Sequence, residues 1–222
     1  NEVGEAVDHA RAQVAALINA EPREIIFTSC GTESDNAALN SALQTQPGKR
    51  HVITTAVEHS ANIKYGQMLE KRGVEVSWIP VDRAGQLDVH EIHEAIREDT
   101  AMVSVMMANN ETGVVFPIEE IAAICRIKGV PFHTDAVQTP GKIELDVKAL
   151  GVDYLSLSAH KLHAPKGIGC LYVRQGLPYQ SYIVGGGQES GRRGGTENVA
   201  YMVAFGKAAE MATASLGGEV ER

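Results

Sequence analysis

Apolar and polar residues follow two different periods along this chain. Residues 3–18 carry apolar side chains at three- and four-residue spacing, which predicts an amphipathic helix. Helical patterns also cover 35–43, 62–72, 89–97, 118–128 and 199–214. Short, almost continuously apolar runs lie at 24–29, 51–55, 74–79, 102–107, 130–134, 154–157 and 170–173. Strands that alternate with helices predict an α/β fold, with a mostly parallel central sheet and helices on both faces.

The composition of the 222-residue chain is that of an ordinary globular domain. It is 44% hydrophobic and 22% charged. No repeat, low-complexity segment or linker divides it, so we expect one domain over residues 1–222. The chain begins and ends within helical patterns and lacks an initiator Met, so we expect it to be a fragment of a longer protein.

Charge and cysteine content argue against several kinds of protein. The net charge is −8 and most cations are scattered, which argues against a nucleic-acid partner. No apolar run reaches the roughly 18 residues of a membrane span, and the acidic start differs from a signal peptide. Cys30, Cys125 and Cys170 stand far apart without disulfide or zinc spacing, which is typical of a reducing compartment. We therefore expect a cytoplasmic protein without a membrane partner.

Unusual polar residues follow the predicted strands. They are Gly31-Thr32, Glu58-His59, Asn109-Asn110-Glu111, Asp135 to Gln138, and Ser158 to Lys161. Ligands of open α/β sheets bind beyond the carboxyl ends of the strands. The sequence therefore predicts that these residues converge on one binding site.

Three of these residues each allow two interpretations. Lys161, at the mouth of a buried strand, is either a solvated surface charge or a desolvated amine able to form a Schiff base. Asp135 is either a helix N-cap or the partner of a protonated ring nitrogen. His59 either begins a helix or lies against a planar cofactor and shuttles protons.

Other motifs have weaker or competing explanations. Gly31 and Thr32, between a strand and a helix, could bind an anion together with Ser158 and His160. Asn109-Asn110 either forms a turn or orients a ligand. His90 and His93 are three residues apart rather than four, so we expect no metal there. Dinucleotide and Walker A fingerprints are absent, and the glycine-rich 185–195 segment is expected to be a mobile lid or subunit-contact loop.

Taken together, these motifs resemble a known family. They are TSCGTESDN at 28–36, VEH at 57–59, ANNETG at 108–113, FHTDAVQ at 132–138, HKLHAPKG at 160–167 and RRGGTEN at 192–198. The chain resembles the cysteine desulfurases, pyridoxal-phosphate enzymes of the class V aminotransferase group. These sequence motifs are most similar to those of the NifS type, which serves iron–sulfur cluster assembly for nitrogenase. The resemblance implies the large, cofactor-binding domain of a fold-type I pyridoxal-phosphate enzyme.

The resemblance also implies a role for each site residue. Lys161 would hold pyridoxal 5'-phosphate through a Schiff base and move the substrate Cα proton. Asp135 would pair with the pyridine nitrogen, and Gln138 would bond the ring hydroxyl. His59 would stack on the ring, and Asn110 would orient cofactor and substrate. The phosphate would be bound by Gly31, Thr32, Ser158, Ala159 and His160, and by Thr196 from the second subunit of a homodimer.

The implied reaction converts L-cysteine to L-alanine. A cysteine thiolate would take the sulfur as a persulfide and pass it to an iron–sulfur scaffold protein. In the family this cysteine and a carboxylate-binding arginine lie in the C-terminal part, and Cys30, Cys125 and Cys170 do not match its position. Two alternatives remain open. One is a selenocysteine lyase or another β-eliminating enzyme of the same fold, and the other is an inactive, truncated scaffold.

Overall fold

The computed structural model describes the backbone of residues 2–219 and the side chains of residues 2–216. The helices are α1 (Glu2–Leu17), α2 (Gly31–Thr45), α3 (Ser60–Lys71), α4 (Val89–Ala95), α5 (Ile118–Lys128), α6 (Val147–Leu150) and α7 (Val199–Glu219). Short 3-10 helices are η1 (Pro22–Glu24), η2 (Ala159–Leu162) and η3 (Gln188–Gly191). The strands are β1 (Ile25–Thr28), β2 (His51–Thr55), β3 (Glu75–Ile79), β4 (Thr100–Ser104), β5 (Phe132–Asp135), β6 (Tyr154–Ser158) and β7 (Gly169–Val173).

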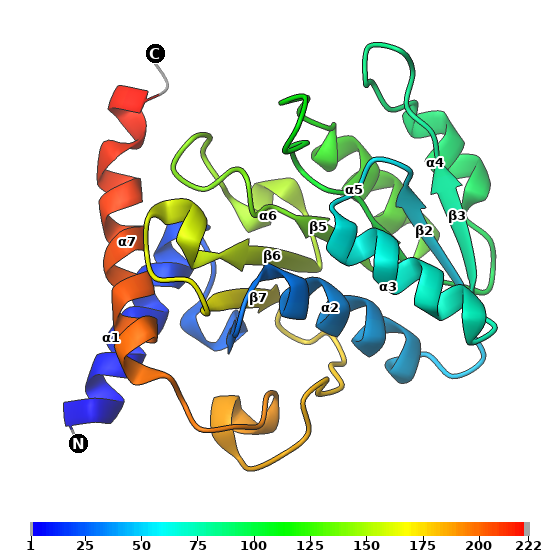
Figure 1. The fold of residues 1–222 in the computed structure, drawn as a ribbon. Coiled ribbons are helices and arrows are strands. Elements are labelled where there is room, and N and C mark those ends of the chain that lie inside the picture. Colours follow the sequence, from blue (N-terminus) through cyan, green and yellow to red (C-terminus); the bar gives the residue numbers. More distant parts are fainter. Residues whose placement is uncertain (1, 220–222) are drawn as a thin grey trace.

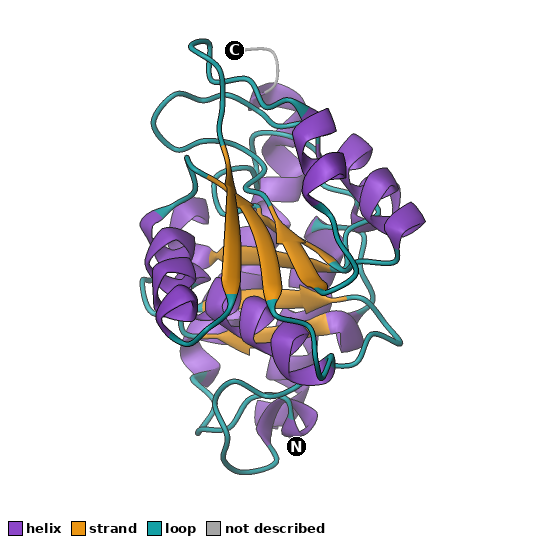
Figure 2. Ribbon diagram, turned by 90° about the vertical axis from the view of Figure 1, so that its right-hand side faces the viewer, coloured by secondary structure: helices purple, strands orange, loops and turns teal. Residues whose placement is uncertain are grey.

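The strands form one seven-stranded sheet in the order β1-β7-β6-β5-β4-β2-β3. Neighbours from β3 to β6 pair in parallel, whereas β7 runs antiparallel to both β6 and β1. Helices cover both faces of the sheet (Figures 1 and 2). The six strands other than the edge strand β3 are wholly buried, which explains their continuous apolar runs. The predicted α/β fold with a mostly parallel sheet is confirmed.

The first and last helices lie side by side at one end of the sheet (Figure 1). Their close approach requires a glycine, because a Cβ on Gly206 would come within 2.7 Å of the Cα of Ala10. Phe205 of α7 meets Phe27 of β1 edge-on, with 6.4 Å between the ring centroids. The α1–α7 pair therefore closes the core at the β1 end of the sheet. None of the described helices is long and apolar enough to cross a membrane.

Several element boundaries differ from the sequence prediction. Helix α2 begins at Gly31 instead of Asp35, so Gly31-Thr32 forms its first turn. The predicted 102–107 strand ends at Ser104, although the backbone N–H of Met107 still donates to the carbonyl of Asp135 at 2.8 Å. Helix α6 was not predicted, because a four-residue helix has too few turns to show a period.

Candidate cofactor-binding cleft

The polar residues at the strand ends do converge. They line a cavity of about 180 Å³ beyond the carboxyl ends of the strands, which we call the strand-end cleft. The lining residues follow β1, β2, β4, β5 and β6: Cys30, Gly31, Thr32, Asp35, His59, Met106, Asn110, Asp135, Val137, Gln138, Ser158, His160 and Lys161. This placement confirms the predicted convergence and gives a lysine, two histidines and two buried carboxyl groups a common space.

A larger groove of about 600 Å³ lies at the opposite, amino ends of β5 and β6. It contains none of the predicted site residues. Two of the charges that line it pair with each other, Arg174 with Asp153 at 2.7 Å. Size alone therefore does not identify the site. The strand-end cleft is the better candidate because it brings the predicted site residues together.

Lys161 lies in η2, the short helix that directly follows β6. The chain leaves this helix at His163, which adopts a left-handed conformation with φ of 63°. Lys161 is exposed, which matches the interpretation of a solvated charge in this structure rather than that of a desolvated amine. The side chain nevertheless reaches the strand-end cleft, where a carbonyl ligand would meet it.

The first turn of α2 forms one wall of the cleft. Gly31 packs so closely that a Cβ in its place would lie 2.8 Å from Cγ2 of Val137. A helix N-terminus offers free N–H groups and a positive dipole end, which suit a phosphate. Ser158 and His160 face it, and the Ser158 hydroxyl lies 2.8 Å from Nδ1 of His160. Burial, followed by the charges of Lys161 and Lys166, lowers the pKa of His160.

His59 confirms the first interpretation drawn from the sequence, the start of a helix, whereas its contact with a planar cofactor stays a prediction. Its Nδ1 accepts a hydrogen bond from the N–H of Ala61 at 3.2 Å and caps helix α3. The same ring lines the strand-end cleft. Because Nδ1 is an acceptor here, a neutral ring carries its proton on Nε2.

Asp135 is the last residue of β5 and is only 5% exposed. Its Oδ1 accepts a hydrogen bond from the N–H of Val137 at 2.9 Å, and no described helix begins beside it. The helix-cap interpretation is therefore wrong. Burial raises the pKa of Asp135, whereas the Val137 bond and the charges of His59 and Lys161 oppose that rise.

The remaining predicted residues divide into two groups. Asn110 and Gln138 line the cleft, and the turn predicted there is made by Asn109, whose Oδ1 accepts from the N–H of Glu111 at 2.9 Å. Ala159 is buried beneath the cleft and does not line it. Thr196 lies in a different cavity with Phe27, Ser29 and Gly167. Within one chain, then, Thr196 is separate from the strand-end cleft.

Sequence reasoning missed one buried carboxyl group, Asp35, and gave no role to a second, Glu58. Asp35 lines the cleft one helical turn beyond Gly31, and this four-residue spacing on α2 was the signal that could have found it. Glu58 lies just before His59 and accepts from the N–H of Met106 at 3.0 Å and from the Thr55 hydroxyl at 2.8 Å. Burial raises the pKa of Glu58 to about 8 in spite of these bonds.

The three cysteines occupy different environments. Cys30 is half-buried and lines the cleft, whereas Cys125 in α5 and Cys170 in β7 are buried. Burial raises the pKa of the Cys125 thiol to about 12 and also raises that of Cys170. The two buried thiols are therefore poor nucleophiles at neutral pH.

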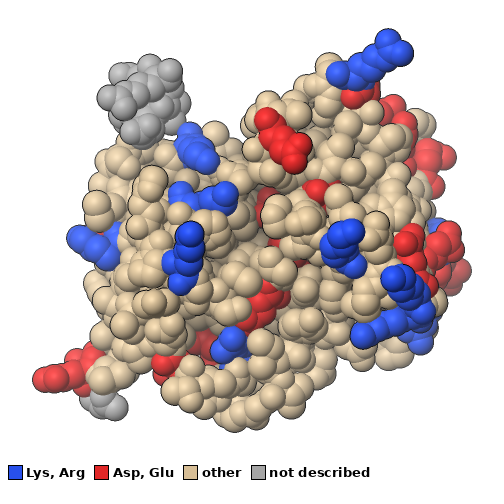
Figure 3. Space-filling view, in the orientation of Figure 1, with Lys and Arg blue, Asp and Glu red and all other residues tan. Residues whose placement is uncertain are grey.

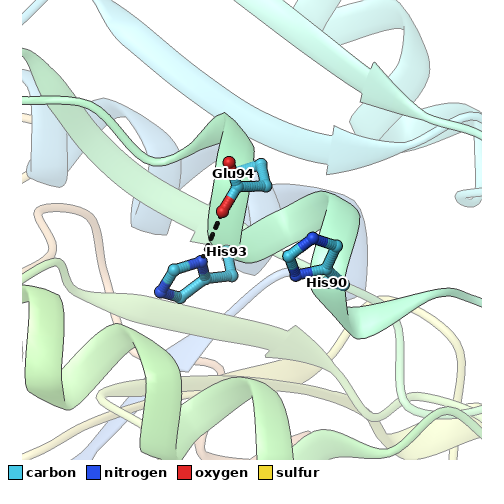
Figure 4. Close-up of side chains that lie close together, drawn as sticks. All are labelled: His90, His93 and Glu94. Carbon is cyan, nitrogen blue, oxygen red and sulfur yellow. Dashed lines mark hydrogen bonds and ion pairs between the residues drawn. The ribbon is translucent and has the colours of Figure 1, made fainter.

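The histidines of α4 come together at the surface, away from the residues of the cleft. Ligand atoms of His90, His93 and Glu94 lie within 4.8 Å of one another (Figure 4). Nδ1 of His93 already bonds Glu94 at 2.9 Å, and the two imidazole rings stack. Protein contacts thus account for this grouping, and the expectation of no metal there stays a prediction.

The surface charge is mixed. On the face shown in Figure 3, Lys and Arg are scattered, and acidic atoms lie between the two bulges of that face. No continuous basic patch is visible on this face. Such a distribution does not favour the backbone of a nucleic acid on this side of the molecule.

The cleft fits pyridoxal phosphate on its own chemistry. A glycine-lined helix N-terminus suits the phosphate, a lysine suits the aldehyde, and a buried aspartate suits a cationic ring nitrogen. In addition, Oδ1 of Asp35 is buried without a hydrogen-bond partner. An orphaned polar atom in a polar cleft indicates a site built to receive a ligand.

Comparisons with known proteins agree with this chemistry. Over 211 residues the chain is 57% identical to "Cysteine desulfurase 2" of Trichormus variabilis, covering 95% of this chain and 53% of that protein. It is 50% identical to "Cysteine desulfurase NifS" of Azotobacter vinelandii over 213 residues, covering 96% and 53%. The solved "NIFS-like protein" superimposes with a TM-score of 0.94 at 42% identity, covering 98% of this chain and 60% of that one.

A second solved structure, "SspA in complex with cysteine", matches with a TM-score of 0.91 at 38% identity, over 94% of this chain and 61% of that one. The chain thus spans about half the length of the curated relatives that it matches. The sequence model of the aminotransferase class-V family matches residues 1–220. The chain therefore belongs to the aminotransferase class-V family.

Proposed function

We propose that this chain forms the cofactor-binding part of a pyridoxal-phosphate-dependent cysteine desulfurase. One observation carries the proposal: Lys161, Asp135, His59 and the Gly31 turn line a single cleft. Each supplies something that a lysine-bound pyridoxal phosphate requires. The relatives named cysteine desulfurase support the choice of reaction.

The phosphate is assigned to the first turn of α2. Gly31 lets the backbone approach closely, and Thr32 adds a hydroxyl. Ser158 and His160 contribute from the end of β6, with Ala159 fixing the backbone between them through its N–H bond to the Ile168 carbonyl. A fixed phosphate would hold the cofactor in one position, so that its reactive atoms stay oriented towards the substrate.

The ring is assigned to other residues that line the same cleft. Asp135, His59 and Gln138 line the cleft, so Asp135 would pair with the pyridine nitrogen, His59 would stack on the ring and Gln138 would bond the ring hydroxyl. Asn110 orients cofactor and substrate. When bound, the cofactor supplies an electron sink for the substrate Cα, and an ionised Asp135 favours the cationic ring that makes this sink effective.

We assign the Cα proton to the amine of Lys161, which removes it from L-cysteine and returns a proton to give L-alanine. The sulfur leaves to a cysteine thiolate as a persulfide and passes to an iron–sulfur scaffold protein, in nitrogenase assembly if the NifS likeness holds. Neither Cys125 nor Cys170 suits this step, because both are buried. Cys30 is unsuitable because it flanks the position assigned to the phosphate.

We further propose a homodimer in the cytoplasm. Thr196 lies outside the cleft of its own chain. We therefore assign its phosphate contact to the cleft of the second subunit. Exposed apolar side chains of the 182–201 segment, Tyr182, Val184 and Tyr201, provide surface for a contact between subunits. Three free cysteines suit a reducing compartment.

The test is an absorption spectrum recorded after pyridoxal phosphate is added to the protein. We expect a near-visible band of lysine-bound cofactor that resists dialysis and that disappears in Lys161→Ala. Lys166→Ala, which removes a neighbouring exposed lysine, is the matched control and should keep the band. A band that survives Lys161→Ala would sink the assignment of the cofactor lysine.

The reaction is tested on the whole protein. Incubation with L-cysteine and a thiol reductant should yield alanine and sulfide in equal amounts, and Lys161→Ala should yield neither. A protein that binds the cofactor but releases no alanine from cysteine would contradict the desulfurase assignment while leaving the cofactor site intact.

A further inference from the structure

Asp35 has no place in the roles assigned above, although it lines the strand-end cleft. It lies on α2 one turn after Gly31, on the side of the helix that faces the sheet. Its residue exposure is 1%, and Oδ1 is buried without a hydrogen-bond partner. A buried, unpaired carboxylate oxygen is costly, so its protonation state needs a physical explanation.

The one described cationic candidate beside Asp35 is His133, whose Nε2 lies 3.6 Å from Oδ1. This ring is not a cation. Its Nδ1 bonds the Ser104 hydroxyl at 2.8 Å and its Nε2 bonds the Ser156 hydroxyl at 2.9 Å. Burial lowers the pKa of His133 to about 3, so the ring is neutral at physiological pH. Asp35 therefore gains no ion pair from it.

Apart from His133, the titratable groups whose charges act most on the pKa of Asp35 are acids, although His59, His160 and Lys161 line the same cleft. These acids are Asp135 on β5, Glu58 before α3 and the thiol of Cys30 before α2. Burial, and then the charge of Asp135, raise the pKa of Asp35 well above its usual range, and a bond from Ser156 opposes them only in part. By contrast, Asp135 receives the Val137 N–H bond and the charges of His59 and Lys161. Of the two carboxyl groups, Asp135 is thus the better place for a negative charge.

Building on the proposed function, we infer that Asp35 is a positioning residue of the cleft. It keeps a proton, so that the two carboxyl groups carry a single negative charge and this charge stays on Asp135, the partner of the ring nitrogen. The retained proton also gives Asp35 an O–H group at the wall of the cleft. This group can donate a hydrogen bond, which an ionised carboxylate cannot. Asp35 acts through Asp135 and does not touch the reacting atoms.

The protonation state is tested first without cofactor. Infrared difference spectra between wild-type and Asp35→Asn protein at pH 7 should show the loss of a protonated carboxyl band. Asp8→Asn, the same change on the exposed face of α1, should instead show the loss of a carboxylate band. Loss of a carboxylate band in Asp35→Asn would overturn the inference. Asp35→Ser, a second variant for the case in which the amide disturbs folding, must give the same result.

The positioning role is tested with pyridoxal phosphate. Asp35→Asn keeps a neutral donor, so the pH at which the bound-cofactor band titrates should not move. If Asp35 were ionised, its removal would lower that pKa by about one unit, because a nearby anion favours the cationic imine. Asp35→Leu is also neutral but has no donor, and it should weaken cofactor binding about tenfold relative to Asp35→Asn. Equal binding by Asn and Leu variants would overturn the donor role.

These outcomes separate the inference from the proposed function. If wild-type protein forms no cofactor band at all, the proposed function fails, whereas the infrared result still decides whether Asp35 holds a proton. If wild-type protein binds cofactor and only the Asp35→Asn titration shifts, the proposed function stands and the inference alone fails.

Discussion

Two regions of this molecule bury carboxyl groups, and they stabilise them in opposite ways. Where the 183–198 loop meets the core, Glu189 of the loop and Glu33 of α2 are buried against arginines. At the strand-end cleft, Asp35 lines the cavity and Glu58 lies just before the lining residue His59, and both are buried without a described cation. The degree of burial is similar, so the difference lies in the partners.

The loop region is electrostatically complete. Glu189 forms two bonds of 2.7 Å with the Arg11 guanidinium and a third, of 2.8 Å, with the N–H of Phe27. These bonds hold Glu189 in a left-handed conformation, with φ of 49°, which a non-glycine residue rarely adopts. Burial alone would raise the pKa of Glu33, but bonds from Arg193 and Ser29 outweigh it and leave the pKa lowered.

In the strand-end cleft, by contrast, the buried carboxyl groups lack such cationic partners among the described residues. These carboxyl groups have raised pKa values, and one oxygen of Asp35 has no partner. Completed pairs fix a loop to the core, whereas buried carboxyl groups with raised pKa values and no described cation are typical of functional sites. The glycine-rich segment expected to be a mobile lid is instead tied to the core at Glu189 and Arg193, while its role in subunit contact stays a prediction.

The largest effect should come from breaking the Arg11–Glu189 pair. Glu189→Gln leaves a mostly buried guanidinium without its anion, which typically costs about 3–5 kcal/mol. Urea unfolding at pH 7 measures the free energy. The matched control is Glu210→Gln, which breaks the exposed Lys207–Glu210 pair and should cost less than about 1 kcal/mol. A loss below about 1 kcal/mol for Glu189→Gln would show that the two regions do not differ as argued.

Glu58 should give the opposite pH dependence to a paired carboxylate. Its folded pKa of about 8 lies above the ordinary value of 4.5, so between these values only the unfolded chain releases the proton. Stability from Glu58 is therefore complete below about pH 4.5 and falls as pH rises to 8. The slope is at most about 1.4 kcal/mol per pH unit, or up to about 4 kcal/mol between pH 5 and 8.

The measurement compares urea unfolding of wild-type and Glu58→Gln protein at pH 5, 6, 7 and 8. Wild-type stability should fall more steeply with pH than that of the variant, whatever their absolute difference. Parallel curves would mean that Glu58 is ionised in the folded protein. Asp35 would then be the one carboxyl group left to support the contrast with the loop.

The convergence of the cleft could be predicted from the sequence because it needs little tertiary information. Parallel strands end at the same edge of a sheet, so recognising the strands before Asp135 and Lys161 was enough to bring these residues together. The family likeness then supplied the roles. The sequence could not decide whether Lys161 is exposed or desolvated, because this depends on how η2 leaves β6.

Other features carried no local signal. Cys30, at the N-cap of α2, makes no side-chain capping bond, so the pattern placed the helix start four residues late. That error put Gly31 and Asp35 in different elements and concealed that they share one helix face. The location of Thr196 was equally inaccessible, because the 174–198 segment has almost no periodicity and is fixed by long-range bonds such as Arg11 to Glu189.

A smaller effect is expected at the second ion pair of the loop. Arg193→Met leaves Glu33 with its Ser29 bonds only, and because Arg193 is partly exposed the cost should be about 2 kcal/mol at pH 7. The lowered pKa of Glu33 means that its stabilisation is present above pH 4.5 and is lost as pH falls. The difference between wild type and variant should therefore shrink from pH 7 towards pH 3. A constant difference would assign the effect to packing of the arginine stem.

The smallest effect on stability is expected at the first turn of α2, which is assigned to the phosphate. Here the shape of the cleft depends on the packing of Gly31 against Val137 rather than on charge. Gly31→Ala places a methyl group 2.8 Å from Cγ2 of Val137, while alanine slightly favours the helix, so stability should change by no more than about 1 kcal/mol. Cofactor affinity, measured by absorbance titration, should fall about tenfold because the helix turn is displaced. Val137→Ala removes the clash, so the double variant should recover most of the affinity, and additive losses would show that Gly31 is needed for backbone conformation instead of close approach.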